Sequence, residues 1–154
     1  MSYNTLIFIH IVSVILLLGV GGGSAFYKFM ADRSKNLEVI VHTNKMVVLA
    51  DWLFTTPSAI LQPLTGIMLI NLMGIPWNTP WLLISLILYT FAGVLWLIAL
   101  YLQIRMKYMA LLAYREKKIL GREYFKLVNY WIWLGVFSFF AMIGVFYLMV
   151  FKLS

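Results

Sequence analysis

The chain of 154 residues contains no cysteine. This absence excludes disulfides, thiolate metal ligands and cysteine nucleophiles together. Charged residues are also scarce, at 11% of the chain, whereas a soluble domain is roughly a quarter charged. Hydrophobic residues make up 64% of the sequence, and its mean hydropathy is +0.94. We therefore expect the chain to reside in a lipid bilayer rather than in water.

Sequence motifs for phosphate binding, zinc binding or nucleophilic catalysis are absent as well. The two histidines, His10 and His42, are expected at depths that differ by roughly 30 Å, from the rise per residue of a helix. This separation excludes a haem held by both histidines of one chain. The net charge of +7 comes mostly from Lys and Arg in two loops. Such loops indicate membrane anchoring rather than a nucleic-acid partner.

Apolar segments long enough to cross a bilayer, at about 20 residues each, account for most of the chain. They predict an all-α fold, an integral membrane four-helix bundle with antiparallel up-down topology. A single domain, 1–154, would hold all of them. No signal cleavage site of the Ala-x-Ala type follows the first segment, so we expect it to be retained. The four predicted spans cover about 3–29, 46–73, 81–103 and 129–151.

The basic residues are distributed unequally among the connections between these spans. Eleven of the twelve Lys and Arg residues lie in or beside the first and third connections, and none lies in the second. Basic loops remain in the cytoplasm during membrane insertion. The distribution therefore predicts a multi-pass protein of the bacterial inner (cytoplasmic) membrane with both termini outside.

The second span carries a polar stripe, in which polar residues follow one another at steps of four and three. This spacing places them on one face of a helix. Polar groups in hydrocarbon cost several kcal/mol unless they are paired, so we expect the face to meet other helices or a cofactor. The polar stripe consists of Asp51, Thr55, Ser58, Gln62 and Thr65.

Asp51 is the one charged residue that the sequence places well inside a span. Two interpretations remain open for it. Asp51 either reaches an ordinary partner, such as Lys45 or the basic connections, or relays a proton or cation. Pro57 and Pro63 are expected to bend the same span and to free backbone carbonyls, which neighbouring Thr and Ser hydroxyls could satisfy.

His10 is predicted to lie on the inward face of the first span, with Ser13 and Leu17. At about 1.5 Å of rise per residue, its depth differs from that of Asp51 by about 20 Å, so the two side chains are not expected to touch. An inward histidine is either hydrogen-bonded packing or a single axial haem ligand, and both interpretations remain open. The polar residues expected at its depth are Gln62, Thr65, Ser85 and Tyr147.

Three stretches resemble a known family: ADWLFTTPSAILQPLTGIMLI, PWLLISLILY and LYLQIRMK. The family is bacterial and consists of predicted integral membrane proteins of unknown function, marked by DWLFTTP and LQPLTG strings. It is distantly similar to HemJ-type membrane protoporphyrinogen oxidases and to CopD-like proteins, four-helix units associated with haem b. IHIVSVILLLG resembles the first span of the oxidases, and this match implies that His10 is the haem-linked histidine. PWLLISL and YFKLVN resemble later segments in the same order. Ser85 stands where the oxidases carry a lysine, which argues against protoporphyrinogen oxidation but not against haem binding.

Two hypotheses about function follow. The resemblance implies a haem-b-binding membrane protein with a redox or electron-transfer role, porphyrin oxidation being one candidate reaction. His10 would hold the iron, and Gln62, Thr65, Ser85 and Tyr147 would lie around the cofactor. The alternative is a non-enzymatic membrane subunit, or a small-molecule or ion carrier, that uses the polar stripe. Either protein would contact the lipid bilayer. A second copy, another membrane subunit, a quinone or a porphyrin are candidate partners, and whether the chain is an enzyme remains open.

Overall fold

The structure, a computed structural model, describes residues 2–152; residues 1 and 153–154 of the predicted single domain lie outside the described range. Residues 2–152 contain α-helices and one π-helical turn, η1, but no strand. The second helix, η1 and the third helix follow one another without a break, so the chain forms four long rods. The elements are α1 (Tyr3–Ser34), α2 (Leu37–Ala50), η1 (Asp51–Thr55), α3 (Thr56–Met73), α4 (Pro80–Arg115) and α5 (Arg122–Phe151).

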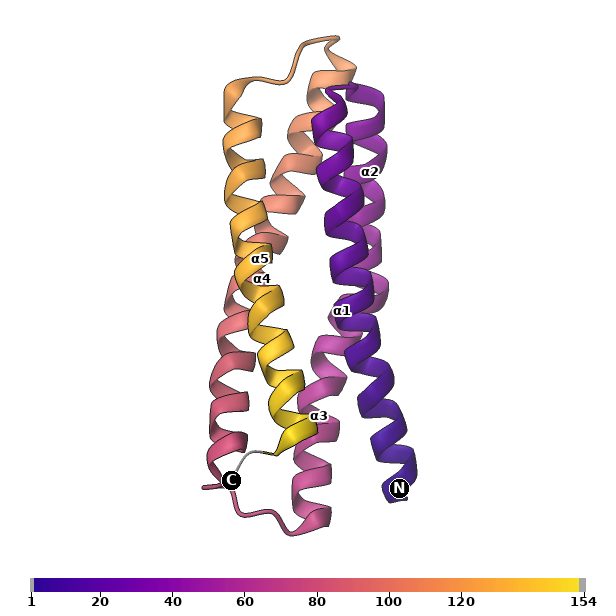
Figure 1. The fold of residues 1–154 in the computed structure, drawn as a ribbon. Helices are drawn as coiled ribbons and strands as arrows, with labels where there is room; N and C mark the ends of the chain where they lie inside the picture. Colours follow the sequence, from indigo (N-terminus) through magenta and orange to yellow (C-terminus); the bar gives the residue numbers. More distant parts are fainter. Residues whose placement is uncertain (1, 153–154) are drawn as a thin grey trace.

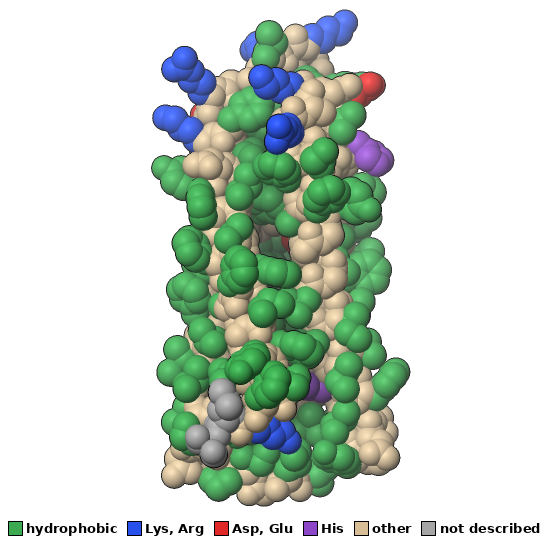
Figure 2. All heavy atoms as spheres, in the orientation of Figure 1, with side chains coloured by type: hydrophobic (Ala, Val, Ile, Leu, Met, Phe, Trp, Pro, Cys, Tyr) green, Lys and Arg blue, Asp and Glu red, His purple; other side chains and the backbone are tan. Residues whose placement is uncertain are grey.

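Figure 1 shows the rods side by side, with successive rods running in opposite directions and both chain termini at the same end of the bundle. Each rod is long and apolar enough to cross a membrane, so the predicted all-α fold with four spans is confirmed. Lys and Arg side chains gather mainly at the end opposite the termini, whereas hydrophobic side chains cover most of the length between the ends (Figure 2). We call these two ends the basic end and the terminal end.

The helices extend beyond the predicted spans at the basic end. α1 continues to Ser34, and α2 begins at Leu37, so only two residues separate them. Lys35 takes a left-handed conformation with φ 55°, which ends α1. The Asn36 side chain accepts hydrogen bonds from two backbone N–H groups of the first turn of α2. A compact turn with polar caps thus joins the two helices, within the interval between the predicted spans 3–29 and 46–73.

The two prolines of the second rod have different structural effects. Pro57 lacks an N–H group, and in a regular helix its ring would clash with the carbonyl four residues earlier. The wider turn of η1 directly precedes it, with the Thr56 N–H donating to the Asp51 carbonyl. Pro63 leaves the Ala59 carbonyl without its usual donor, and the Tyr89 hydroxyl of α4 donates to that carbonyl at 2.6 Å. The partner of this freed carbonyl is therefore a tyrosine of another helix, not a neighbouring Thr or Ser.

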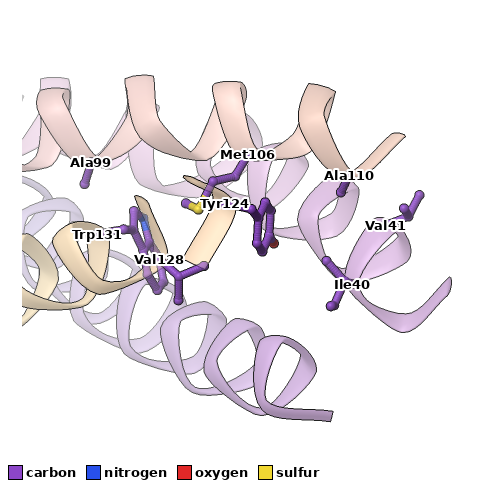
Figure 3. Packing of buried hydrophobic residues seen from close by; sticks show 8 residues of the cluster. All are labelled: Ile40, Val41, Ala99, Met106, Ala110, Tyr124, Val128 and Trp131. Carbon is purple, nitrogen blue, oxygen red and sulfur yellow. The ribbon is translucent and has the colours of Figure 1, made fainter. Parts of the chain in front are cut away.

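The largest cluster of buried apolar residues lies toward the basic end, where α2, α4 and α5 meet. Figure 3 shows side chains of all three helices directed toward one another there. A smaller cluster lies nearer the terminal end, with Ala92 on α4 packed against Ala141 and Met142 on α5. The large cluster consists of Ile40, Val41, Ala99, Met106, Ala110, Tyr124, Val128 and Trp131.

Candidate functional site

All five residues of the polar stripe are buried, with 2–4% of each residue exposed. The stripe thus faces the interior of the bundle along η1 and α3. Its members fall into two groups with different partners. Gln62 and Thr65 lie near α1 toward the terminal end, whereas Asp51 lies near α4 and α5 at mid-bundle. The two groups are described separately below.

His10 of α1 is hydrogen-bonded to α3 through both ring nitrogens. The Thr65 hydroxyl donates to the Leu61 carbonyl at 2.7 Å, so it accepts from the N–H at Nδ1 of His10, at 2.8 Å. The Gln62 amide donates to Nε2 of His10 at 3.0 Å. These partners define a neutral ring that carries its proton on Nδ1. The ring also lies against the backbone of α3, because a Cβ added at Gly66 would come within 3.4 Å of its Cε1.

The other two residues predicted at this depth, Ser85 and Tyr147, form their interactions with residues other than His10. Ser85 is buried, and its hydroxyl donates within its own helix, to the Trp81 carbonyl at 2.7 Å. Tyr147 is 49% exposed and stacks on Phe151, with ring centroids 4.5 Å apart. The structure thus brings Gln62 and Thr65 to His10, and it gives Ser85 and Tyr147 other surroundings.

The hydrogen bonds of His10 determine which of its ring nitrogens could bind a haem iron. Nε2 is the nitrogen with a free electron pair, but the Gln62 amide donates to it. Iron could bind Nε2 only if the Gln62 side chain turned away. The Gln62 carboxamide oxygen has no hydrogen-bond partner within the described chain, so the movement would break one side-chain hydrogen bond, but the side chain is fully buried and its neighbours would have to move with it. The Nδ1–H donated to Thr65 resembles the arrangement that fixes ligating histidines in metal sites.

The second group connects three helices through one line of hydrogen bonds. The Gln103 amide on α4 donates to Oδ2 of Asp51 at 2.6 Å. The Trp131 indole N–H on α5 donates to the carboxamide oxygen of the same glutamine at 2.8 Å. All three residues are buried. Asp51 forms no ion pair with a described Lys or Arg, and Lys45, its candidate partner from the sequence, is exposed.

A cavity of about 450 Å³ lies beside this line of hydrogen bonds, between α1, η1, α3, α4 and α5. Asp51, Gln103 and Trp131 all line it. Figure 2 shows the bundle hollowed at mid-height, with an acidic side chain visible inside the hollow. Small residues leave the space open: Gly21, Gly22, Ala92, Gly93, Ala99 and Gly135.

Unpaired polar atoms distinguish this cavity. Among the described residues, four buried side-chain N or O atoms have no hydrogen-bond partner, and two of these, on Thr55 and Trp96, belong to residues that line the cavity. The Asp51 carboxylate accepts its one short hydrogen bond from Gln103, at 2.6 Å, and the Thr55 hydroxyl lies close to it. Buried polar groups are normally paired, and each orphan costs about 1–3 kcal/mol. The cavity therefore presents a hydroxyl, an indole N–H and a carboxylate oxygen that a bound molecule can pair.

A further buried cluster was missed by the sequence analysis, which assigned Lys28 to the basic connection. The Lys28 ammonium donates to Oδ2 of Asp32 and to Oδ1 of Asn44, both at 2.8 Å. The Tyr124 hydroxyl donates to Oδ1 of Asp32 at 2.7 Å and accepts from the Asn44 amide at 2.9 Å. Asp51 is thus not the one ion inside the bundle. The spacing of Lys28 and Asp32, four residues apart on one helix, was the available signal.

Comparison with protein families gives one match. The family model described as predicted integral membrane protein (DUF2269) matches residues 4–153. No curated protein and no solved structure matches the chain. The match covers almost the whole chain, in agreement with its four long apolar helices. The chain therefore belongs to this family of predicted integral membrane proteins.

Proposed function

We propose that the protein is a membrane-embedded binding protein, either a carrier or the binding subunit of an assembly, for a small lipid-soluble molecule held in the mid-bundle cavity. The observation that supports it is that the unpaired groups of Thr55 and Trp96 line the same cavity as the Asp51 carboxylate. The cavity volume of about 450 Å³ lies within the range of about 300–1,000 Å³ typical of small-molecule sites. A mainly apolar lining with a few convergent polar groups is also typical of such sites.

The surroundings of the cavity favour a ligand that arrives from the bilayer. Phe29, Phe139 and Phe140 line the cavity and are also 40–67% exposed on the outside of the bundle. Their rings thus lie between the cavity and the lipid. We propose that the protein is placed in a bacterial inner membrane with its basic end in the cytoplasm, because nearly all of its Lys and Arg residues gather at that end.

A cavity-filling variant tests this function. Gly93 lines the cavity, and a Cβ added there has no atom within 4 Å, so Gly93→Leu should fill the space without a clash at Cβ. Gly23 has the same freedom and lies outside the cavity, so Gly23→Leu is the matched control. The probe is 11-bromoundecan-1-ol, a neutral alcohol whose bromine quenches Trp96 and Trp131 on contact.

We expect saturable quenching of tryptophan fluorescence in wild type and in Gly23→Leu, with the saturable part lost in Gly93→Leu. The measurement uses protein in lipid nanodiscs, so that the outer surface of the bundle stays in contact with lipid. Quenching that rises linearly with probe in all three proteins would reflect partitioning into lipid only, and it would contradict the proposal.

A second candidate function, haem b binding and electron transfer, rests on His10. The Thr65 hydroxyl accepts from Nδ1, which leaves Nε2 as the nitrogen for iron once Gln62 turns away. Bound haem would supply one-electron redox chemistry. The absorbance spectrum of protein expressed with added haem tests this candidate. A Soret band that strengthens in Gln62→Ala and disappears in His10→Ala would support it, whereas wild type and Gln62→Ala without a band would exclude it.

A further inference from the structure

We infer that the cavity selects a lipophilic organic cation, with Asp51 as its counter-ion; this inference rests on the proposed function and names the class of its ligand. Among the residues that line the cavity, Asp51 is the one acid, and none is Lys, Arg or His. Lys28, a buried cation of α1, is already paired with Asp32. The cavity thus offers one negative group and no positive one.

The carboxylate of Asp51 is held in place by uncharged partners only among the described residues. Gln103 donates to Oδ2, and Trp131 holds Gln103 in turn. The Thr55 hydroxyl lies close to the same carboxylate, and no described Lys or Arg forms an ion pair with it. A carboxylate enclosed by apolar groups is costly unless a cation accompanies it. A cation entering the cavity would supply the missing partner for an acceptor that is already oriented.

Aromatic side chains around the cavity suit the body of an organic cation. Trp96, Trp131, Tyr89, Phe139 and Phe140 all line it. Aromatic faces attract cations, and the attraction grows when both groups are removed from water. Trp131 already shows this behaviour within the protein, because the Lys28 ammonium lies 5.4 Å from its ring centroid.

A bare metal ion is a poorer match than an organic cation. The described residues contain no group of three or more His, Cys, Asp or Glu side chains that could hold a metal ion. Calcium takes about 6–8 oxygen ligands, whereas Asp51 and Thr55 supply few oxygens. An apolar lining around one carboxylate instead matches a cation with an apolar body, such as an alkylammonium or arylphosphonium ion.

The test uses tetraphenylphosphonium, a lipophilic cation, and tetraphenylborate, an anion of nearly the same shape. The full chain is placed in nanodiscs of phosphatidylcholine, whose zero net charge removes attraction by the lipid surface. Equilibrium dialysis should show saturable binding of the phosphonium and none of the borate. Asp51→Asn should weaken phosphonium binding at least tenfold, whereas Glu123→Gln, which removes an exposed carboxylate outside the cavity, should leave it unchanged.

The remaining outcomes separate this inference from the proposed function. If bromoundecanol binds saturably but neither tetraphenylphosphonium nor the slimmer decyltrimethylammonium does, the inference fails and the proposed function stands. If neither the alcohol nor the cations bind, both fail. Phosphonium binding of equal strength in wild type and Asp51→Asn would also overturn the inference. Bromoundecanol binding by Asp51→Asn checks that this variant keeps the cavity.

Discussion

The Lys28 cluster and the Asp51 cluster are both polar, both buried and both connected to α5, yet their hydrogen bonding differs. In the first, the ammonium of Lys28, both oxygens of Asp32, the amide of Asn44 and the hydroxyl of Tyr124 all have partners. In the second, the Asp51 carboxylate has no cation from the described chain, and the unpaired groups of Thr55 and Trp96 line the same open cavity.

This difference separates two uses of polar groups in an apolar bundle. A fully paired network fixes the helices that contribute to it, because breaking any member exposes the others to an apolar interior. Incompletely paired groups at a cavity fix little within the protein and remain available to a ligand. Substitutions in the Lys28 cluster should therefore change stability, and substitutions in the Asp51 cluster should change binding.

The largest effect is expected from Lys28→Met. It leaves the buried Asp32 carboxylate without its cation, which costs about 3–5 kcal/mol in comparable buried pairs. Unfolding followed by helical circular dichroism during titration with sodium dodecyl sulfate measures the loss. Lys45→Met removes an exposed lysine and is the control. Equal stability of both variants would contradict a structural role for the cluster.

Tyr124→Phe should have the next largest effect, about 1–3 kcal/mol of stability. The change removes the hydroxyl that donates to Asp32 and accepts from Asn44, while keeping the ring in the apolar core. The same unfolding titration measures it. Tyr130→Phe, at a position 63% exposed, should have no measurable effect. A Tyr124→Phe protein as stable as the control would show that the hydroxyl is dispensable.

His10→Phe should cost about 1 kcal/mol, because it removes two hydrogen bonds between α1 and α3. The expected loss is smaller than at Lys28, since no buried charge is left unpaired. His42→Phe, a change at an exposed position, is its control in the same titration. If His10→Phe matched His42→Phe in stability, the contact between α1 and α3 would not depend on the imidazole.

No loss of stability is expected from Thr55→Val, which should be at least as stable as wild type, because the hydroxyl that it removes is buried without a partner in the described chain. Thr65→Val makes the same replacement of a hydroxyl by a methyl group, but the hydroxyl that it removes accepts a hydrogen bond from His10. Thr65→Val should therefore be less stable than Thr55→Val. Binding of bromoundecanol should reverse this order, with the weaker affinity in Thr55→Val. Loss of stability in Thr55→Val equal to that in Thr65→Val would remove the distinction between paired and unpaired groups.

The fold followed from local features of the sequence. Long apolar runs determine helices in a bilayer, so four of them could be predicted without knowledge of their packing. The polar stripe could be assigned to the interior because its spacing places it on one face. The common depth of His10, Gln62 and Thr65 could be predicted from the rise per residue of a helix. Depth also grouped Ser85 and Tyr147 with them, so it did not distinguish which residues contact the imidazole.

The parts that could not be predicted depend on contacts between distant segments. Lys28 follows an apolar run and precedes Arg33 and Lys35, so it has the local surroundings of a surface lysine. Its burial is decided by Asn44 and Tyr124, which lie 16 and 96 residues further along the chain. The unpaired state of Thr55 is likewise invisible in the sequence, because it depends on which partners the packing fails to provide.

The exposed phenylalanines beside the cavity affect how any affinity should be expressed. A molecule that reaches the site from the acyl chains is first concentrated there according to its oil–water partition coefficient. Its dissociation constant, counted per litre of buffer, would then shift with the amount of phospholipid in the sample, even though the site itself is unchanged. Mole fraction in the bilayer is the scale on which different ligands, and different preparations, can be compared.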